Sequence, residues 1–233
     1  GSVLTDAREF TMTPDRTRAA VISQTKGAGR LCIVDTDTSS ATFLQVLVNV
    51  PVPPSAAHPS PTTSQPRQVV LSPDASHCSV SLSVDSSGWE IACYDLAAGA
   101  WIDFLPSVPA LVHLGQDSQT PLMVYGEHLR DMVVASDGSL YVVAPNSVGR
   151  VVLNGANATF TPLTTTSSLQ EAVAVALNRD ETSLVVGVGR EPRFGAPSSG
   201  SPLGLVFCDV ATLPEFDYVD LGVSAAPVGL TWR

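Results

Sequence analysis

Four times along this chain a short apolar run ends at an aspartate, and residues typical of β-strands follow each time. The runs are Phe10–Asp15, Val69–Asp74, Met132–Asp137 and Val175–Asp180. A fifth run, Val228–Trp232, begins in the same way. The aspartates lie 59, 63 and 43 residues apart. A period of roughly 40–50 residues indicates an array of one supersecondary unit rather than an irregular fold.

Each unit contains short runs of β-branched and aromatic residues separated by turn residues. The first unit has such runs at Thr17–Thr25, Arg30–Thr38 and Ala41–Val50, with a glycine-containing turn at Lys26–Gly29. This pattern is typical of strands, and four strands per unit at this period is typical of a propeller blade. The sequence therefore predicts an all-β protein, a β-propeller with four blades and the first strand of a fifth, belonging to a ring of five to seven blades.

The unit boundaries follow from the same register. Residues 1–2 have the character of a cloning scar, and residues 3–233 form one propeller domain or part of one. The predicted units span about 8–50, 67–104, 129–165, 172–222 and 226–233. A proline-rich insertion at 51–66 and a second insertion at 105–126 lengthen the first two intervals. Ser167–Leu177 could open as a helix, but its register with the other units favours a strand from Ala172.

Charge and hydropathy exclude two classes of partner. The chain carries 22 acidic and 12 basic residues, a net charge of −10. A nucleic-acid surface needs a basic patch, so we expect no nucleic-acid partner. No apolar run approaches the roughly 18 residues of a membrane span. A glycosylation sequon at Asn157 leaves an extracellular location open, although a cytoplasmic one is favoured and the native N-terminus is not visible.

The four cysteines have no metal-ligand spacing. Cys32, Cys93 and Cys208 each stand within three residues before an aspartate, in corresponding runs of three units. The favoured interpretation is that the cysteines are small buried apolar residues. The alternative is a disulfide between Cys78 and Cys93, whose runs are predicted to be neighbouring strands.

A second repeat appears once the units are aligned on their aspartates. Seven residues before three of them stands an arginine, followed by a polar residue, giving the pairs Arg8–Glu9, Arg67–Gln68 and Arg130–Asp131. This position starts the innermost strand of a blade, at one mouth of the central channel. Such a polar ring could bind an anionic group through bidentate hydrogen bonds. The alternative is structural, with arginines and acids of adjacent blades pairing to lock the ring.

Evidence for catalysis is weak. Glu127 and His128 form the one acid–histidine neighbour pair near the predicted channel mouth, and we include them as candidate binding residues. No nucleophile motif accompanies them. We predict no catalytic residues, no metal site and no cofactor.

Two stretches resemble known propeller repeats. Asp137–Leu153 (DGSLYVVAPNSVGRVVL) is similar to an NHL-type repeat, and the segment from Ala172 to Leu213 resembles YncE-like and lactonase-like repeats, with its N-x-D-x-[ST] turn and later D-V-A-T. The resemblance covers nearly the whole chain and implies a ring of six or seven blades. Some lactonase-type relatives hold a metal on acidic or amide residues around the channel; here the matching positions carry arginines as often as acids.

The sequence thus favours a non-enzymatic interaction scaffold that binds a protein partner through its loop face or channel mouth. A second chain or a further segment completing the propeller is another expected partner. The first alternative is a lactonase-like hydrolase with a divalent ion near Glu9, Asp131, Glu127 and His128. The second is a secreted or surface recognition module, suggested by the sequon.

Overall fold

The computed structural model shows strands and turns only. It describes residues 6–25, 28–53, 64–84, 88–102, 111–113, 129–144, 147–154, 157–165, 172–188, 204–211 and 216–220, and this part of the chain contains no helix. Contacts divide the protein into two compact units, one formed by residues 1–116 with 153–158 and the other by 117–152 with 159–233. Each unit is described by itself.

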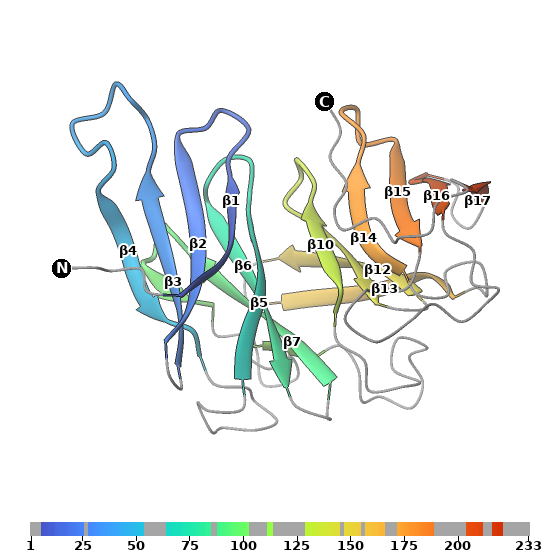
Figure 1. Ribbon diagram of the computed structural model, residues 1–233, viewed down its shortest axis with the longest axis horizontal. Coiled ribbons are helices and arrows are strands. Elements are labelled where there is room, and N and C mark those ends of the chain that lie inside the picture. Colours follow the sequence, from blue (N-terminus) through green and yellow to red (C-terminus); the bar gives the residue numbers. More distant parts are fainter. Residues whose placement is uncertain are drawn as a thin grey trace. The chain divides into compact units, whose positions relative to one another are not determined.

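The first unit holds two antiparallel sheets (Figure 1). Sheet 1 runs in the order β1 (Ala7–Met12), β2 (Arg18–Thr25), β3 (Ala28–Asp35) and β4 (Val46–Pro51). Sheet 2 runs in the order β5 (Ser64–Leu71), β6 (His77–Val84), β7 (Gly88–Asp95) and β8 (Ala100–Trp101), and β9 (Leu111–His113) also pairs with β7.

The second unit repeats this architecture, with strands joined in sequence order. Sheet 3 comprises β10 (Asp131–Val134), β11 (Leu140–Ala144), β12 (Ser147–Asn154) and β13 (Asn157–Thr165). Sheet 4 comprises β14 (Ala172–Leu177), β15 (Ser183–Val188), β16 (Gly204–Asp209) and β17 (Phe216–Asp220). The strand at Ala172 is therefore confirmed.

The fourth strand of sheet 2 is made in two pieces. β8 pairs with Tyr94 and Asp95, whereas β9 pairs with Glu90 to Ala92. Between these pairs the Ile102 amide donates to the Cys93 carbonyl over 2.8 Å, so the ladder along β7 continues. β9 lies inside the 105–126 segment that the sequence pattern assigned to an insertion, so these three residues of that segment belong to sheet 2.

Alternation along the strands gives each sheet two faces, and one apolar core lies between the two sheets of each unit. We call the face toward the following sheet the forward face and the opposite one the backward face. In the first unit the forward face of sheet 1, with Ile22 and Leu31, packs on the backward face of sheet 2, with Val69, Val80 and Leu82. All five side chains are buried.

The core of the second unit follows the same rule. The forward face of sheet 3, with Tyr141 and Val143, packs on the backward face of sheet 4, with Val175, Val186 and Cys208. Burial of aliphatic side chains at roughly 1.5–3 kcal/mol each supplies the main stabilisation of such an inter-sheet core.

The four cysteines are free and buried, as the favoured interpretation predicts. Cys78 pairs in register with Tyr94, and Ser79 pairs with Cys93. Since successive residues of a strand point to opposite faces, Cys78 and Cys93 lie on opposite faces of sheet 2. The alternative of a disulfide between them is therefore wrong for this structure.

Candidate binding site at the strand bulges

The arginine repeat coincides with a repeat of β-bulges. The register of the first strand shifts in three of the four sheets, between Ala7 and Glu9 in sheet 1, between Pro66 and Gln68 in sheet 2, and between Ala172 and Ala174 in sheet 4. The inserted residues are thus Arg8, Arg67 and, in sheet 4, Val173. A bulge leaves one residue outside the regular pairing and redirects its side chain. Sheet 4 therefore has a bulge at the corresponding position, but the inserted residue there is not an arginine.

Sheet 3 has the same local geometry at Arg130. Asp131 opposes Val143, and the Arg130 amide also donates to the Val143 carbonyl over 2.8 Å. Two successive residues therefore face one partner, as at a bulge. By pairing, Asp131 corresponds to Glu9, which opposes Ile22 in sheet 1.

In the first unit two of the arginine pairs lie on neighbouring strands, because β1 and β5 pack side by side. The Arg8 and Arg67 side chains are exposed, while Glu9 and Gln68 are half-buried. Arg8 Nη2 is 3.9 Å from the exposed carboxylate of Asp6, a distance at which an ion pair contributes little in water. This bulge end thus presents two guanidinium groups beside two polar side chains.

In the second unit Asp131, which follows Arg130, accepts hydrogen bonds from two backbone amides of the fold. Asp131 Oδ2 accepts a hydrogen bond from the Val175 amide over 2.8 Å, and its Oδ1 accepts one from the Met132 amide over 2.9 Å. The carboxylate therefore joins the first strand of sheet 3 to the first strand of sheet 4. The structural alternative drawn from the sequence predicts that this aspartate pairs with an arginine of the adjacent sheet. This contact with sheet 4 is instead made by the backbone amide of Val175.

Glu127 and His128 lie outside the described residues. Arg130 and Asp131 belong to one unit, and Arg8, Glu9, Arg67 and Gln68 to the other. Among the described residues no cluster of three His, Cys, Asp or Glu side chains is placed to hold a metal ion. The described part of the chain also has no helix of the length and apolar character needed to cross a membrane.

The opposite ends of the strands carry the aspartate turns. Asp15 Oδ1 accepts hydrogen bonds from the Thr13 hydroxyl (2.6 Å) and from the amide and hydroxyl of Thr17 (3.0 and 2.9 Å). Asp74 is bonded in the same way by Ser72 and Ser76. In each turn the residue after the aspartate has a positive φ; these residues are Arg16, Ala75, Gly138 and Glu181.

Hydrogen bonds to the charged form lower the pKa of these aspartates. Donation by Ser72, then by Ser76, lowers the pKa of Asp74 to about 2. The Thr13 hydroxyl, followed by Thr17, lowers the pKa of Asp15. Burial raises the pKa of Asp137, but hydrogen bonds from Ser139 and the charge of Arg150 outweigh it, so the net shift is downward.

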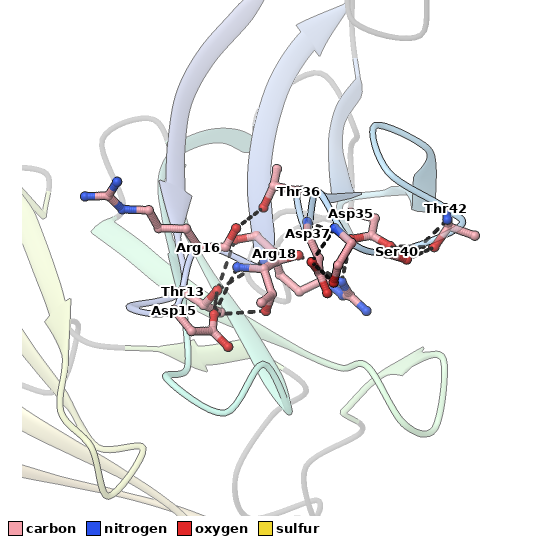
Figure 2. A network of polar contacts seen from close by, with 11 residues as sticks. Thr13, Asp15, Arg16, Arg18, Asp35, Thr36, Asp37, Ser40 and Thr42 are labelled. Atoms are coloured by element: carbon pink, nitrogen blue, oxygen red, sulfur yellow. Dashed lines mark hydrogen bonds and ion pairs between the residues drawn. The ribbon is translucent and has the colours of Figure 1, made fainter.

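A polar network that the sequence did not reveal surrounds Asp35 at the end of β3 (Figure 2). Asp35 is buried, and Arg18 Nη1 donates to its Oδ1 over 2.7 Å. The hydroxyls of Ser40 and Thr42 donate to its Oδ2. Donation by Thr42, then by Ser40, lowers the pKa of Asp35 to about 2.

This network has counterparts in two other sheets. Asp95 accepts from the amides of Ala97 and Ala98 at 2.8 and 2.9 Å, and Asp209 accepts from the Ala211 amide at 2.7 Å. The signal was in the sequence, since each of these aspartates closely follows one of the cysteines of the third strands. These side chains close the turn after the third strand, which is a structural role.

Comparison with known proteins gives the fold. No family model and no curated protein matches the chain. A β-propeller domain from Myceliophteria thermophila matches 96% of this chain and 62% of its own, with a TM-score of 0.58 and 9% identity. A protein from Lactobacillus plantarum matches over 96% and 57% (TM-score 0.56, 19% identity). A candidate 6-phosphogluconolactonase from Bacteroides uniformis matches over 95% and 56% (TM-score 0.51, 13% identity).

These similarities concern the fold alone, because none of the three sequence identities exceeds 19%. The chain spans about half the length of the solved structures it matches. The number of blades in a complete ring, and the fifth unit expected at 226–233, which lies outside the described residues, therefore stay predictions. The four-stranded sheets, their sequence-ordered strands and these neighbours together confirm that the chain is a β-propeller repeat protein.

Proposed function

We propose that the protein is a non-enzymatic interaction scaffold that binds an acidic segment of a protein partner at the bulge end of its first strands. The observation that carries this proposal is the position of Arg8 and Arg67. Both are exposed and occupy the bulges of two neighbouring strands in a chain of net charge −10. Planar guanidinium groups suit bidentate recognition of carboxylates.

The hydrolase alternative has less support from the described residues. Asp131 would be one of its metal ligands, yet both carboxylate oxygens of Asp131 already accept backbone hydrogen bonds. A metal would compete with these bonds and with the link between β10 and β14. The geometry at Asp131 favours a structural role for this carboxylate.

The test is partner capture with a charge-matched control. The double variant Arg8→Ala/Arg67→Ala removes two positive charges at the bulge end. The control, Arg16→Asn/Arg179→Ala, removes two exposed arginines from the aspartate turns, and asparagine tolerates the positive φ of Arg16. Proteins retained from a lysate by each variant are compared by quantitative mass spectrometry, and a glutamate-rich peptide serves as a defined probe by fluorescence anisotropy.

We expect the bulge variant to lose at least about tenfold in peptide affinity, with two charge-assisted contacts contributing roughly 1.5–3 kcal/mol, while the control keeps most of its affinity. Binding should also weaken with added salt, because exposed charges are screened. Equal losses in both variants would mean that only net charge matters and would contradict a site at Arg8 and Arg67.

A further inference from the structure

A buried serine of sheet 1 has a hydroxyl group without a hydrogen-bond partner. Ser23 on β2 is 1% exposed, and its Oγ atom makes no hydrogen bond among the described residues. Buried polar groups are nearly always satisfied in folded proteins, because an unsatisfied one destabilises the fold. The Ser23 hydroxyl is therefore a hydrogen-bond donor that the described part of the fold does not use.

The repeat places an apolar residue at this position in two other sheets. The residue in question is the one on the second strand that pairs with the residue before the bulge. It is Ser23 in sheet 1, Leu82 in sheet 2 and Val188 in sheet 4. Leu82 is fully buried in the core of the first unit. The serine of sheet 1 is thus a departure from the repeat that folding stability does not explain.

Two arginines flank Ser23 across the strands of sheet 1. On one side Ser23 pairs with Ala7, and Arg8 is the inserted residue next to that pair. On the other side Ser23 pairs with Arg30 of β3. Directly paired residues of antiparallel strands point to the same face of a sheet, and the backbones of β1 and β3 are two strand spacings, or about 10 Å, apart. We call Arg8, Ser23 and Arg30 the polar strip.

The positive charges of the polar strip are weakly compensated. Arg30 Nε donates to Asn49 Oδ1 over 2.6 Å, and Arg30 Nη2 donates to the Asn49 carbonyl over 3.0 Å. Both acceptors are neutral, and no acidic side chain of the described residues pairs with Arg30. Arg8 has the 3.9 Å contact with the exposed Asp6. The strip thus presents two guanidinium groups in a protein of net charge −10, and the Asn49 contacts reduce the freedom that Arg30 loses on binding.

We propose that the acidic segment of the partner crosses sheet 1 along the polar strip, from Arg8 to Arg30, and that one of its carboxylates accepts a hydrogen bond from the Ser23 hydroxyl. A carboxylate is an acceptor for both hydroxyl and guanidinium donors. Ser23 is covered in the unbound protein, so binding requires neighbouring side chains to change rotamer, which is common at interfaces. This inference rests on the proposed function, since Arg8 belongs to both, and it adds Ser23 and Arg30 as binding residues.

Ser23→Ala tests the role of the hydroxyl with two measurements that should move in opposite directions. Affinity for the glutamate-rich peptide, measured by fluorescence anisotropy, should fall about threefold, because a hydrogen bond to a charged group is lost. The midpoint of chemical denaturation should rise, because a buried donor without a partner is removed. Ser72→Ala is the matched control, since Ser72 is buried but its hydroxyl is bonded to Asp74 at the opposite strand ends. The control should lose stability and keep its affinity.

Arg30→Gln tests the far end of the polar strip. The change removes the positive charge but leaves an amide that can bond to Asn49, so we expect little loss of stability. Affinity for the same peptide should fall at least about threefold, because a charge-assisted contact is lost. Arg179→Gln is the control, since it removes the same charge from an exposed position in the second unit, and its affinity should stay close to that of the wild type.

The pattern across the variants separates this inference from the proposed function. If Arg8→Ala/Arg67→Ala loses affinity while Ser23→Ala and Arg30→Gln keep it, the path along the strip is overturned and the proposed function stands. If Ser23→Ala and Arg30→Gln lose affinity while Arg67→Ala alone does not, the path is supported and the site at Arg67 is wrong. Equal losses in Arg30→Gln and Arg179→Gln, or a wild-type protein that binds no glutamate-rich peptide, would also overturn the inference.

Discussion

Gly29 lies directly against the ring of Pro66. A Cβ atom added at Gly29 would stand 2.4 Å from Pro66 Cγ and 2.5 Å from Cδ. Gly29 is on β3, and Pro66 is the residue before the Arg67 bulge on β5. The proline ring is buried. Because Gly29 has no side chain, the backbone of sheet 1 can approach the bulge of sheet 2 closely at this point.

Replacing Gly29 by alanine should therefore destabilise the protein. Two ring carbons would have to move by several tenths of an ångström, and overpacking of this kind costs about 1–3 kcal/mol. Chemical denaturation of Gly29→Ala should show a lower midpoint. In a Pro66→Ala background the same change should cost much less, because the ring carbons are gone. Equal costs in both backgrounds would contradict a steric origin.

Ser136 and Glu181 connect the aspartate turns of sheets 3 and 4. The Ser136 amide and hydroxyl donate to the two carboxylate oxygens of Glu181 over 2.6 and 2.7 Å. Glu181→Gln replaces one acceptor by a donor that faces a donor, so we expect a loss of about 1 kcal/mol for this partly solvated pair. A double-mutant cycle with Ser136→Ala should give a coupling of roughly 0.5–1 kcal/mol. Additive effects would show that the two residues act independently.

The register of the turns could be predicted from sequence because their chemistry is local. A serine or threonine two residues before an aspartate and another two residues after it suffice to close the turn, as Ser72, Asp74 and Ser76 do. The third turn keeps only the second of these residues, because Ala135 stands two residues before Asp137 and Ser139 two after it. In the fourth turn the Asn178 side chain instead accepts the Ser183 amide over 2.9 Å. The sequence repeat placed Asp180 correctly in phase but did not show that Asn178 closes the turn.

The role of the arginine repeat could not be predicted from sequence. Spacing revealed Arg8, Arg67 and Arg130, but a bulge depends on the pairing partner across the sheet, which one strand does not specify. Val173 shows the consequence, because it occupies the bulge of sheet 4 without resembling an arginine. The Asp35 network was hidden for a similar reason, because it joins Arg18 on β2 to Ser40 and Thr42 after β3.

The aspartate turns should make stability depend on acid pH. The pKa of Asp74 is lowered to about 2 by hydrogen bonds from Ser72 and Ser76. Because the pKa in the folded state lies below the value of about 3.9 in an unfolded chain, Asp74 contributes stability above about pH 4, and this contribution disappears as the pH falls toward 2. Asp74→Asn should lower stability at pH 7 and flatten the decline between pH 4 and 2.

The matched control for this experiment is Asp180→Asn, which removes an exposed aspartate from the corresponding place in the fourth turn. Unfolding midpoints measured by circular dichroism from pH 2 to 7 compare the three proteins. The control should follow the wild-type profile. A profile of Asp74→Asn parallel to that of the wild type would show that the hydrogen bonds of Asp74 do not contribute to folding.

The buried cysteines should react with thiol reagents only after unfolding. Burial raises the pKa of Cys93 to about 11 and that of Cys208 to about 12, and it raises the pKa of Cys78 well above its usual range. The thiolate is the reactive form, so both access and ionisation are suppressed in the native protein. An aromatic disulfide reagent at pH 8 should release little signal from the native protein and four equivalents in denaturant. Rapid release of one equivalent without denaturant would identify a thiol that the fold does not protect, and substitution of each cysteine by alanine in turn would show which one it is.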